Sequence, residues 1–367
     1  MFWGRTSRIL GMVLLFVVVA AFYAYLEADL VGVPSNLYGE ALSRDEHSIK
    51  GAVVEKVALY PQKMARSHER IMRKALFVKR KKAIGTVLIS HGFMCTKEDI
   101  SFLRSLFPEY NSMVFDMRAH GENAEGQYCT LGRDEALDVA TAARYLRNRE
   151  DLRGQKLLLY GFSMGAVAAI EAQANDSTLF DGMILDCPFE SSENVIKRGL
   201  SNMKLSLFGY EISIPGKTLM EKYIFHPYVQ SFIKSMLKAF GKMDTKDIKA
   251  FVYPVNPAKS IARVSVPLYL IGCKKDDKVS IAGLKRIYSN AGSKYKKLWV
   301  SNGRQHFDSY FYNPELYARR VAKFSHRLFS GKLNCAEKQK IIEDKDPASL
   351  AVHINAGRFT EIKKKEK

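Results

Sequence analysis

The chain has 367 residues, of which 57 are Lys or Arg and 38 are Asp or Glu, so its formal net charge is +19. This length accommodates one large α/β domain with an insertion, and no internal repeat indicates a solenoid or a propeller. No nucleic-acid-binding motif accompanies the basic charge, which leaves attraction to anionic lipids or acidic substrates, or an ordinary solvated surface, as its explanation.

The first element is an uncharged, mostly apolar run at residues 9–26. A helix of this length spans about 27 Å, close to the ~30 Å hydrocarbon core of a bilayer. We therefore expect a membrane anchor in residues 1–26. A cleaved signal peptide is the alternative, but the apolar run is longer than a usual signal core and no Ala-x-Ala occurs near its end.

Charge on either side of this run predicts its orientation. Arg5 and Arg8 precede it, whereas Glu27 and Asp29 follow it. Basic residues favour the cytoplasmic side, so the remainder of the chain is expected outside the cytoplasm, in the periplasm if the protein is bacterial, or secreted if a signal is cleaved. Residues 27–50 are then a tether.

Residues 51–190 alternate strand-like and helical patterns, which is typical of a parallel sheet covered on both faces. An apolar strand at residues 84–90 ends at His91-Gly92-Phe93. The loop after such a strand can aim the Phe93 N–H toward a pocket at the sheet edge, although His91-Gly92 is equally consistent with a simple turn.

A second strand, at residues 113–117, leads into a polar loop. Asp116 and Arg118 are spaced to pair with each other or with neighbouring loops, which predicts a structural role. His120 is predicted to hold this loop rather than to act as a base. A helix over residues 134–149 follows and connects to the next strand.

The most informative segment begins with the apolar strand at residues 157–162 and continues as Gly161-Phe162-Ser163-Met164-Gly165. A serine with glycine two residues away on each side can occupy a tight strand-to-helix turn, because glycine lets neighbouring backbone approach closely. The alanine-rich run after Ser163 predicts a helix whose first amides, including that of Met164, point back toward the hydroxyl.

Three later apolar strands each end beside a side chain suited to catalysis. Residues 182–185 precede Asp186, residues 266–272 precede Asp276 and Asp277, and residues 297–300 precede His306. Catalytic groups of open α/β sheets lie just beyond such strand ends. A serine, a carboxylate and a histidine therefore follow one another in the order Ser163, Asp276, His306.

The alternation is broken over residues 191–260. Apolar residues at near-helical spacing in residues 217–240 include an aromatic stripe, which favours packing over substrate contact. Residues 261–330 resume the α/β pattern. Residues 331–367 lose apolar periodicity and end in lysines, so we expect a basic, disordered tail.

Five segments in this order, HGF, FDMRAHGEN, GFSMG, IGCKKDDKV and GRQHF, resemble the motifs of the α/β-hydrolase superfamily, and in detail its serine aminopeptidase-like or Bem46-like branch. The resemblance covers about residues 50–330. It implies a mostly parallel central sheet with helices on both faces and an inserted helical cap, which residues 191–260 would form.

The resemblance also implies the roles of the site residues. Ser163 would be the nucleophile, His306 the general base and Asp276 the acid, with the N–H groups of Phe93 and Met164 as the oxyanion hole. Asp277 and Asp186 stay open as alternative acids, because some relatives place the acid after the strand that ends at residue 186.

These expectations combine into a membrane-anchored serine hydrolase that cleaves a carboxylic ester or thioester through an acyl-enzyme. A peptidase, an acyltransferase and a catalytically silent scaffold stay open. The substrate is expected to be a small or lipid-like acyl compound, with no cofactor and no metal. The five cysteines, Cys95, Cys129, Cys187, Cys273 and Cys335, show neither CxxC nor metal-ligand spacing, so no disulfide framework or zinc site is predicted.

Overall fold

The computed structural model describes residues 49–60, 72–123, 127–202, 204–207, 210–213, 217–231, 250–333 and 339–344. The expected anchor at residues 9–26 lies outside these ranges. Within them, no helix has both the length and the apolar character that crossing a bilayer requires.

One sheet organises the described chain, with nine strands in the order β1-β2-β4-β3-β5-β6-β9-β10-β11. β1 is antiparallel to β2 and β2 to β4, whereas the other neighbours are parallel, as expected for a mostly parallel sheet. The strands are β1 (Val53–Leu59), β2 (Arg73–Lys79), β3 (Thr86–Ser90), β4 (Asn111–Phe115), β5 (Leu157–Phe162), β6 (Gly182–Asp186), β9 (Leu268–Cys273), β10 (Lys296–Ser301) and β11 (Lys340–Glu343).

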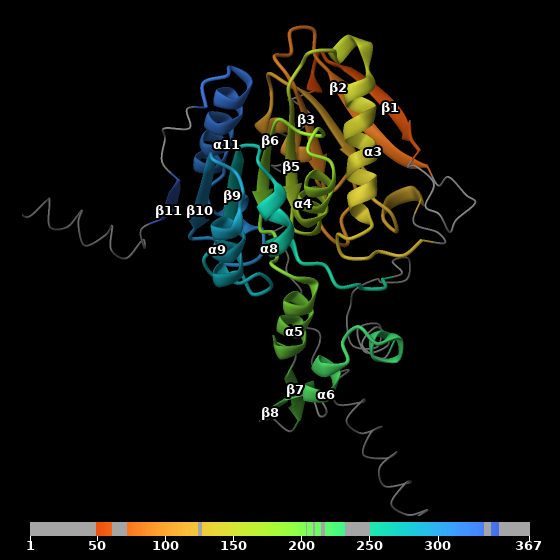
Figure 1. Ribbon diagram of the computed structural model, residues 1–367, viewed down its shortest axis with the longest axis vertical. Helices are drawn as coiled ribbons and strands as arrows, with labels where there is room; N and C mark the ends of the chain where they lie inside the picture. Colours follow the sequence, from red (N-terminus) through yellow and green to blue (C-terminus); the bar gives the residue numbers. More distant parts are fainter. Residues whose placement is uncertain are drawn as a thin grey trace, which may run out of the picture.

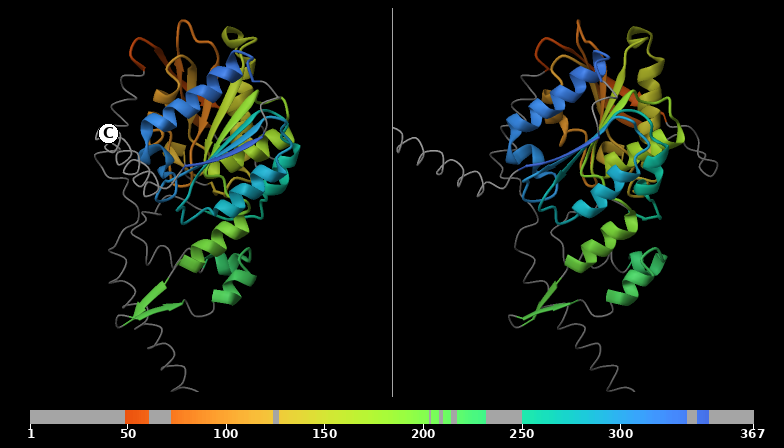
Figure 2. Two further views of the ribbon diagram at one scale, coloured as in Figure 1. Left: turned by 90° about the vertical axis from the view of Figure 1, so that its left-hand side faces the viewer. Right: turned by 60° about the vertical axis from the view of Figure 1, so that its left-hand side comes forward.

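Helices cover both faces of the sheet, and Figure 2 shows α11 on the opposite side from α4 and α9. One face packs against α3 (Glu135–Asn148), α4 (Met164–Asn175), α8 (Pro257–Ser260) and α9 (Ile281–Asn290). The other packs against η1 (Ser101–Leu106), α10 (Asp308–Tyr312) and α11 (Pro314–Phe329). The remaining 3-10 turns are η2 (Gly121–Asn123), η3 (Glu150–Leu152) and η4 (Ile261–Arg263).

Strand β3 illustrates why both faces are apolar. Its side chains alternate, so Val87 and Ile89 enter the core under α11, while Leu88 enters the core under α4. All three are fully buried. A strand covered on both faces is a continuous apolar run, and that is the pattern visible in the sequence.

The insertion between β6 and β9 extends away from the core, below it in the view of Figure 1. The part that extends away includes α5 (Ser192–Asn202), α6 (Lys217–Lys222) and an antiparallel pair, β7 (Lys204–Leu207) with β8 (Tyr210–Ser213). The insertion is therefore helical with a small hairpin.

The expectation that the apolar and aromatic stripe of the insertion is packed is wrong for three of its four described residues. Leu219, Tyr223 and Tyr228 are 63%, 46% and 82% exposed. The fourth, Ile224, is buried as expected, and so is the adjoining Met220. Helical spacing identified an amphipathic segment here but assigned three exposed residues to its buried face.

The expected disorder after residue 330 is also wrong for one segment. Lys340–Glu343 forms β11, which pairs in parallel with β10. The indole N–H of Trp299, on β10, donates to the Asp344 side chain at 3.0 Å and so holds the end of β11 in place. The ladder bonds of a neighbouring strand stabilise this short segment, and local composition carries no sign of them.

Candidate active site

Ser163 occupies the turn between β5 and α4 with φ 50° and ψ −116°. This positive φ is unusual for a residue with a side chain. Its N–H donates to the Asp186 carbonyl at 2.8 Å, which ties the turn to β6. A Cβ added at Gly165 would lie 2.5 Å from the His91 carbonyl oxygen, and one at Gly161 would lie 2.7 Å from Ala166 Cα. Both glycines are therefore required by close backbone packing.

His306 lies in the loop between β10 and α10 and contacts the serine. Its Nε2 is 2.8 Å from Ser163 Oγ, and its Nδ1 is 2.8 Å from Asp276 Oδ2. If Nδ1 carries the proton that Asp276 accepts, Nε2 presents a lone pair to the serine hydroxyl. Residues separated by 143 and 30 positions thus form one hydrogen-bonded chain.

Asp276 is buried just beyond the end of β9. Its second oxygen accepts from the N–H groups of Lys278 and Val279 at 2.8 and 2.7 Å. Burial by itself raises the pKa of this carboxyl, but the nearby imidazole of His306 and the two N–H groups outweigh burial and hold the pKa below its usual value. The carboxylate is therefore ionised and oriented toward His306.

The two alternative acids lie elsewhere. Asp186 is fully buried and accepts from the hydroxyls of Tyr317 and Tyr160 at 2.6 and 3.2 Å, and burial raises the pKa of its carboxyl. Asp277 is exposed, and its carbonyl accepts from Arg198 Nε at 2.9 Å. Neither carboxylate takes the place of Asp276 beside His306.

The two expected oxyanion donors belong to adjacent segments. Ser90 Oγ donates to the Gly165 carbonyl at 3.1 Å, which brings the loop after β3 against the first turn of α4. Phe93 lies in that loop, and Met164 is the first residue of the helix. Neither N–H donates a hydrogen bond to another described residue.

Two histidines hold the loop that carries Phe93. His91 Nδ1 lies 2.8 Å from the Gly92 carbonyl and its Nε2 accepts from Met117 N–H at 2.9 Å. His120 accepts from Met94 N–H at 3.1 Å, as expected of a residue that holds a loop. Burial lowers the pKa of both, to about 3 for His91. Both rings are therefore neutral acceptors at neutral pH.

The polar residues after β4 are structural, as the sequence indicates. Asp116 accepts from Lys97 Nζ and from Lys97 N–H, each at 2.8 Å. Arg118 Nε donates to Asp138 at 2.9 Å, and Arg73 reaches the same carboxylate at 3.0 Å. The pairing runs to neighbouring elements rather than between Asp116 and Arg118.

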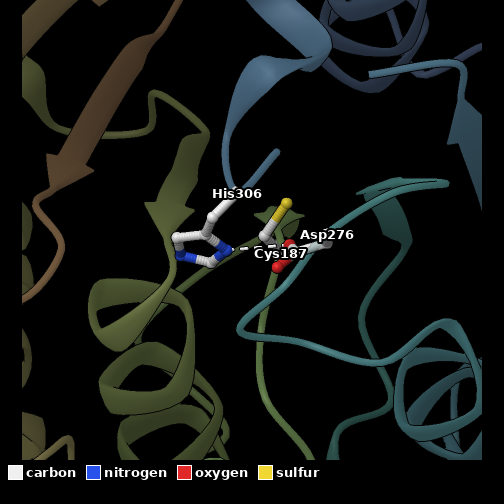
Figure 3. Close-up of side chains that lie close together, drawn as sticks. All are labelled: Cys187, Asp276 and His306. Atoms are coloured by element: carbon white, nitrogen blue, oxygen red, sulfur yellow. Dashed lines mark hydrogen bonds and ion pairs between the residues drawn. The ribbon is translucent and has the colours of Figure 1, made fainter. Parts of the chain in front are cut away.

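Two residues beside the triad were not identified from the sequence. Arg198, on α5, donates to the Asp276 carbonyl at 3.2 Å as well as to that of Asp277. Cys187 follows β6 and lies beside Asp276 and His306 (Figure 3). The position of Cys187 just after a strand end was the sequence feature that could have identified it, whereas nothing in the local sequence distinguishes Arg198.

An apolar cluster adjoins the nucleophile. It contains Val167, Phe189, Val255 and Val279, with Leu131 and Val195 packed against it. Val167 N–H donates to the Ser163 carbonyl, one helical turn away. A pocket of about 150 Å³ borders this cluster between α5 and the loop that carries Asp276, and Arg198 and Lys278 contribute to its lining.

The sequence of the chain is similar to those of known proteins. Residues 81–307 match the family model described as Serine aminopeptidase, S33. The uncharacterized protein YqkD of Bacillus subtilis is 26% identical over 242 residues, which cover 65% of this chain and 70% of YqkD.

Solved structures share the fold. The Pyrococcus furiosus esterase Pf2001 has 20% identity and a TM-score of 0.55, and the match covers 82% of this chain and 98% of the esterase. The peroxisomal α/β-hydrolase Lpx1 of Saccharomyces cerevisiae has 14% identity and a TM-score of 0.50, over 86% of this chain and 98% of Lpx1. The chain therefore has the α/β-hydrolase fold, belongs to the serine aminopeptidase S33 family and is a serine hydrolase.

Proposed function

We propose that the protein cleaves a carboxylic ester or thioester through an acyl-enzyme. Ser163 attacks the carbonyl carbon while His306 Nε2 takes the hydroxyl proton, and Asp276 stabilises the resulting imidazolium. The N–H groups of Phe93 and Met164 stabilise the oxyanion. His306 then returns the proton to the leaving group, and water releases the acid by the same steps.

The observation that carries this proposal is the continuous hydrogen-bonded chain. Ser163 Oγ, the His306 ring and the Asp276 carboxylate are joined by two contacts of 2.8 Å each. A serine hydroxyl is a weak nucleophile without a base, and this arrangement supplies the base in a fixed orientation. The chemistry needs no cofactor.

Charge near the site favours an ester over a free-amine peptide. The pocket beside the acid loop is lined by the cations Arg198 and Lys278. Its one carboxylate, Glu190, is paired with Arg286 Nη1 at a hydrogen-bonding distance of 2.5 Å. A protonated amino terminus would find no uncompensated acidic partner there. Phe189, Val195 and Val279 of the apolar cluster line the same pocket and suit the acyl group of an ester.

A substrate panel tests the proposal. Purified protein is assayed with p-nitrophenyl esters of increasing acyl length and with aminoacyl anilides, beside Ser163→Ala. We expect ester hydrolysis that the variant lacks. Preference for the anilides would favour the second candidate, an aminopeptidase, which the family description supports. Acyl transfer to an added alcohol would indicate an acyltransferase, and inactivity of both proteins would favour a scaffold.

We also propose that residues 9–26 anchor the enzyme in a membrane, with residues 27–50 as a tether and the catalytic domain outside the cytoplasm. The support is the apolar run and the arginines before it. A reporter fused after Leu26 should be exported. Activity of the reporter in the cytoplasm would contradict this topology. We further propose that the chain belongs to the Bem46-like branch and that residues 191–260 form a cap.

A further inference from the structure

Cys187 joins the catalytic pair in a compact set of metal-binding groups. One ligand atom each from Cys187, Asp276 and His306 lie within 4.8 Å of one another. Figure 3 shows the three side chains together, with the hydrogen bond between the histidine and the aspartate. Their spacing in the sequence gives no sign of a site, because the fold brings three separate strand ends to one edge of the sheet.

These groups match the ligands that zinc prefers. Tetrahedral zinc takes thiolate sulfur at about 2.3 Å and imidazole nitrogen or carboxylate oxygen at about 2.0–2.2 Å, so its ligand atoms lie roughly 3.3–3.8 Å apart. The Nδ1 and Oδ2 atoms are now 2.8 Å apart, separated by a proton. A zinc-sized ion in the place of that proton requires shifts of about 1 Å or less at each ligand.

A second thiol lies close by. Cys273 Sγ is 4.0 Å from Cys187 Sγ, near the roughly 3.8 Å that separates two thiolates on one tetrahedral zinc. The four described cysteines are free thiols. Cys187 and Cys273 are both fully buried, whereas the His306 side chain is 13% exposed and forms the open side of the cluster.

We propose that Cys187, His306 and Asp276 form an inhibitory site for zinc or another thiophilic divalent cation. The S–H bond of Cys187 breaks, a sulfur–metal bond forms and the thiol proton leaves to solvent. His306 Nδ1 binds the metal and its proton moves to Nε2. A protonated Nε2 has no lone pair for the Ser163 proton, so bound metal and base catalysis exclude each other.

The inference rests on the proposed function only where the experiment measures enzyme activity. Metal binding is therefore also measured directly, by a signal that does not depend on activity. Cd²⁺ bound to a thiolate gives an ultraviolet charge-transfer band. The full chain is titrated with Cd²⁺ and, separately, with Zn²⁺ during ester hydrolysis, for wild type and Cys187→Ser. Cys95→Ser is the matched control, because Cys95 is the more exposed thiol.

We expect both metals to inhibit wild type and Cys95→Ser, and EDTA to restore activity. Cys187→Ser should need at least about tenfold more metal, and its cadmium band should be lost. Equal inhibition of Cys187→Ser and wild type, or a band that only Cys95→Ser loses, would overturn the site. If Cys187→Ser does not fold, Asp276→Asn should still weaken cadmium binding, and an unchanged affinity would count against the proposal. If the wild type is inactive but still shows the cadmium band, the proposed hydrolase function is contradicted and the metal site is not.

Discussion

Arg198, on helix α5 of the insertion, donates to the main-chain carbonyl of Asp276 at 3.2 Å and to that of Asp277 at 2.9 Å. The inserted segment is thus fastened to the loop that carries the acid. The same loop is fastened from the other side, where Lys275 N–H donates to the Gly303 carbonyl at 3.2 Å. The orientation of Asp276 therefore depends on the insertion as well as on the sheet.

Arg198→Gln should lower kcat more than it raises KM, because it frees the acid loop without touching the reacting atoms. We expect a loss of about tenfold, the cost of roughly one charge-assisted hydrogen bond. Lys197→Gln is the matched control, since Lys197 pairs only with Glu193 of its own helix among the described residues. Steady-state kinetics are measured for both variants. Equal losses of kcat in the two would contradict a special role of Arg198 in positioning Asp276.

Asp276→Asn should reduce turnover by about 10⁴-fold, because an amide no longer holds the reactive tautomer of His306. Asp186→Asn should keep most of the turnover, since Asp186 bonds to Tyr317 and Tyr160 instead. Measured kcat values for the two variants distinguish the acids. The reverse pattern would assign the acid to Asp186.

Gly165→Ala should inactivate and destabilise the protein. Its new Cβ would meet the carbonyl oxygens of Ser90 and His91, and a backbone contact of this kind cannot be relieved by rotating a side chain. Gly199→Ala is the control, because nothing lies within 4 Å of its added Cβ in helix α5. Thermal unfolding should show a loss of stability for the first, and a change within about 1 kcal/mol for the second.

His91 predicts a pH dependence of stability. Burial lowers the pKa of the folded imidazole to about 3, while the unfolded value is about 6.5. The folded state therefore binds fewer protons than the unfolded state. The part of the free energy of unfolding that depends on His91 is fully present above about pH 6.5, and it falls by up to roughly 1.4 kcal/mol per pH unit as the pH decreases toward 3. His91→Gln keeps an acceptor that does not titrate. Urea unfolding between pH 7.5 and 4.5 should show a smaller loss for the variant, and parallel losses would exclude His91 as the cause.

The architecture around the nucleophile could be predicted because its causes are local. The Gly-x-Ser-x-Gly turn, the continuous apolar strands and the polar side chains after their ends are all visible within a few residues. Parallel strands place such ends at one edge, so the proximity of Ser163, Asp276 and His306 followed from topology.

Other features depend on partners that are distant in sequence. Strand β11 exists because β10 offers an unpaired edge, and its own composition resembles a tail. Cys187 becomes a candidate metal ligand only because the fold places it beside His306, 119 positions further along the chain. Arg198 depends on a carbonyl in another segment. Pattern and propensity describe one segment at a time, so they carry no information on these pairs.

The most direct test of the account is the site of covalent labelling. Full-length protein is treated with a fluorophosphonate probe and its peptides are analysed by mass spectrometry, beside Ser163→Ala and His306→Gln. We predict a phosphonylated Ser163 in wild type, none in the alanine variant and greatly slowed labelling in the glutamine variant. A folded wild type that stays unlabelled, or that carries the label on another residue, would contradict the proposed nucleophile.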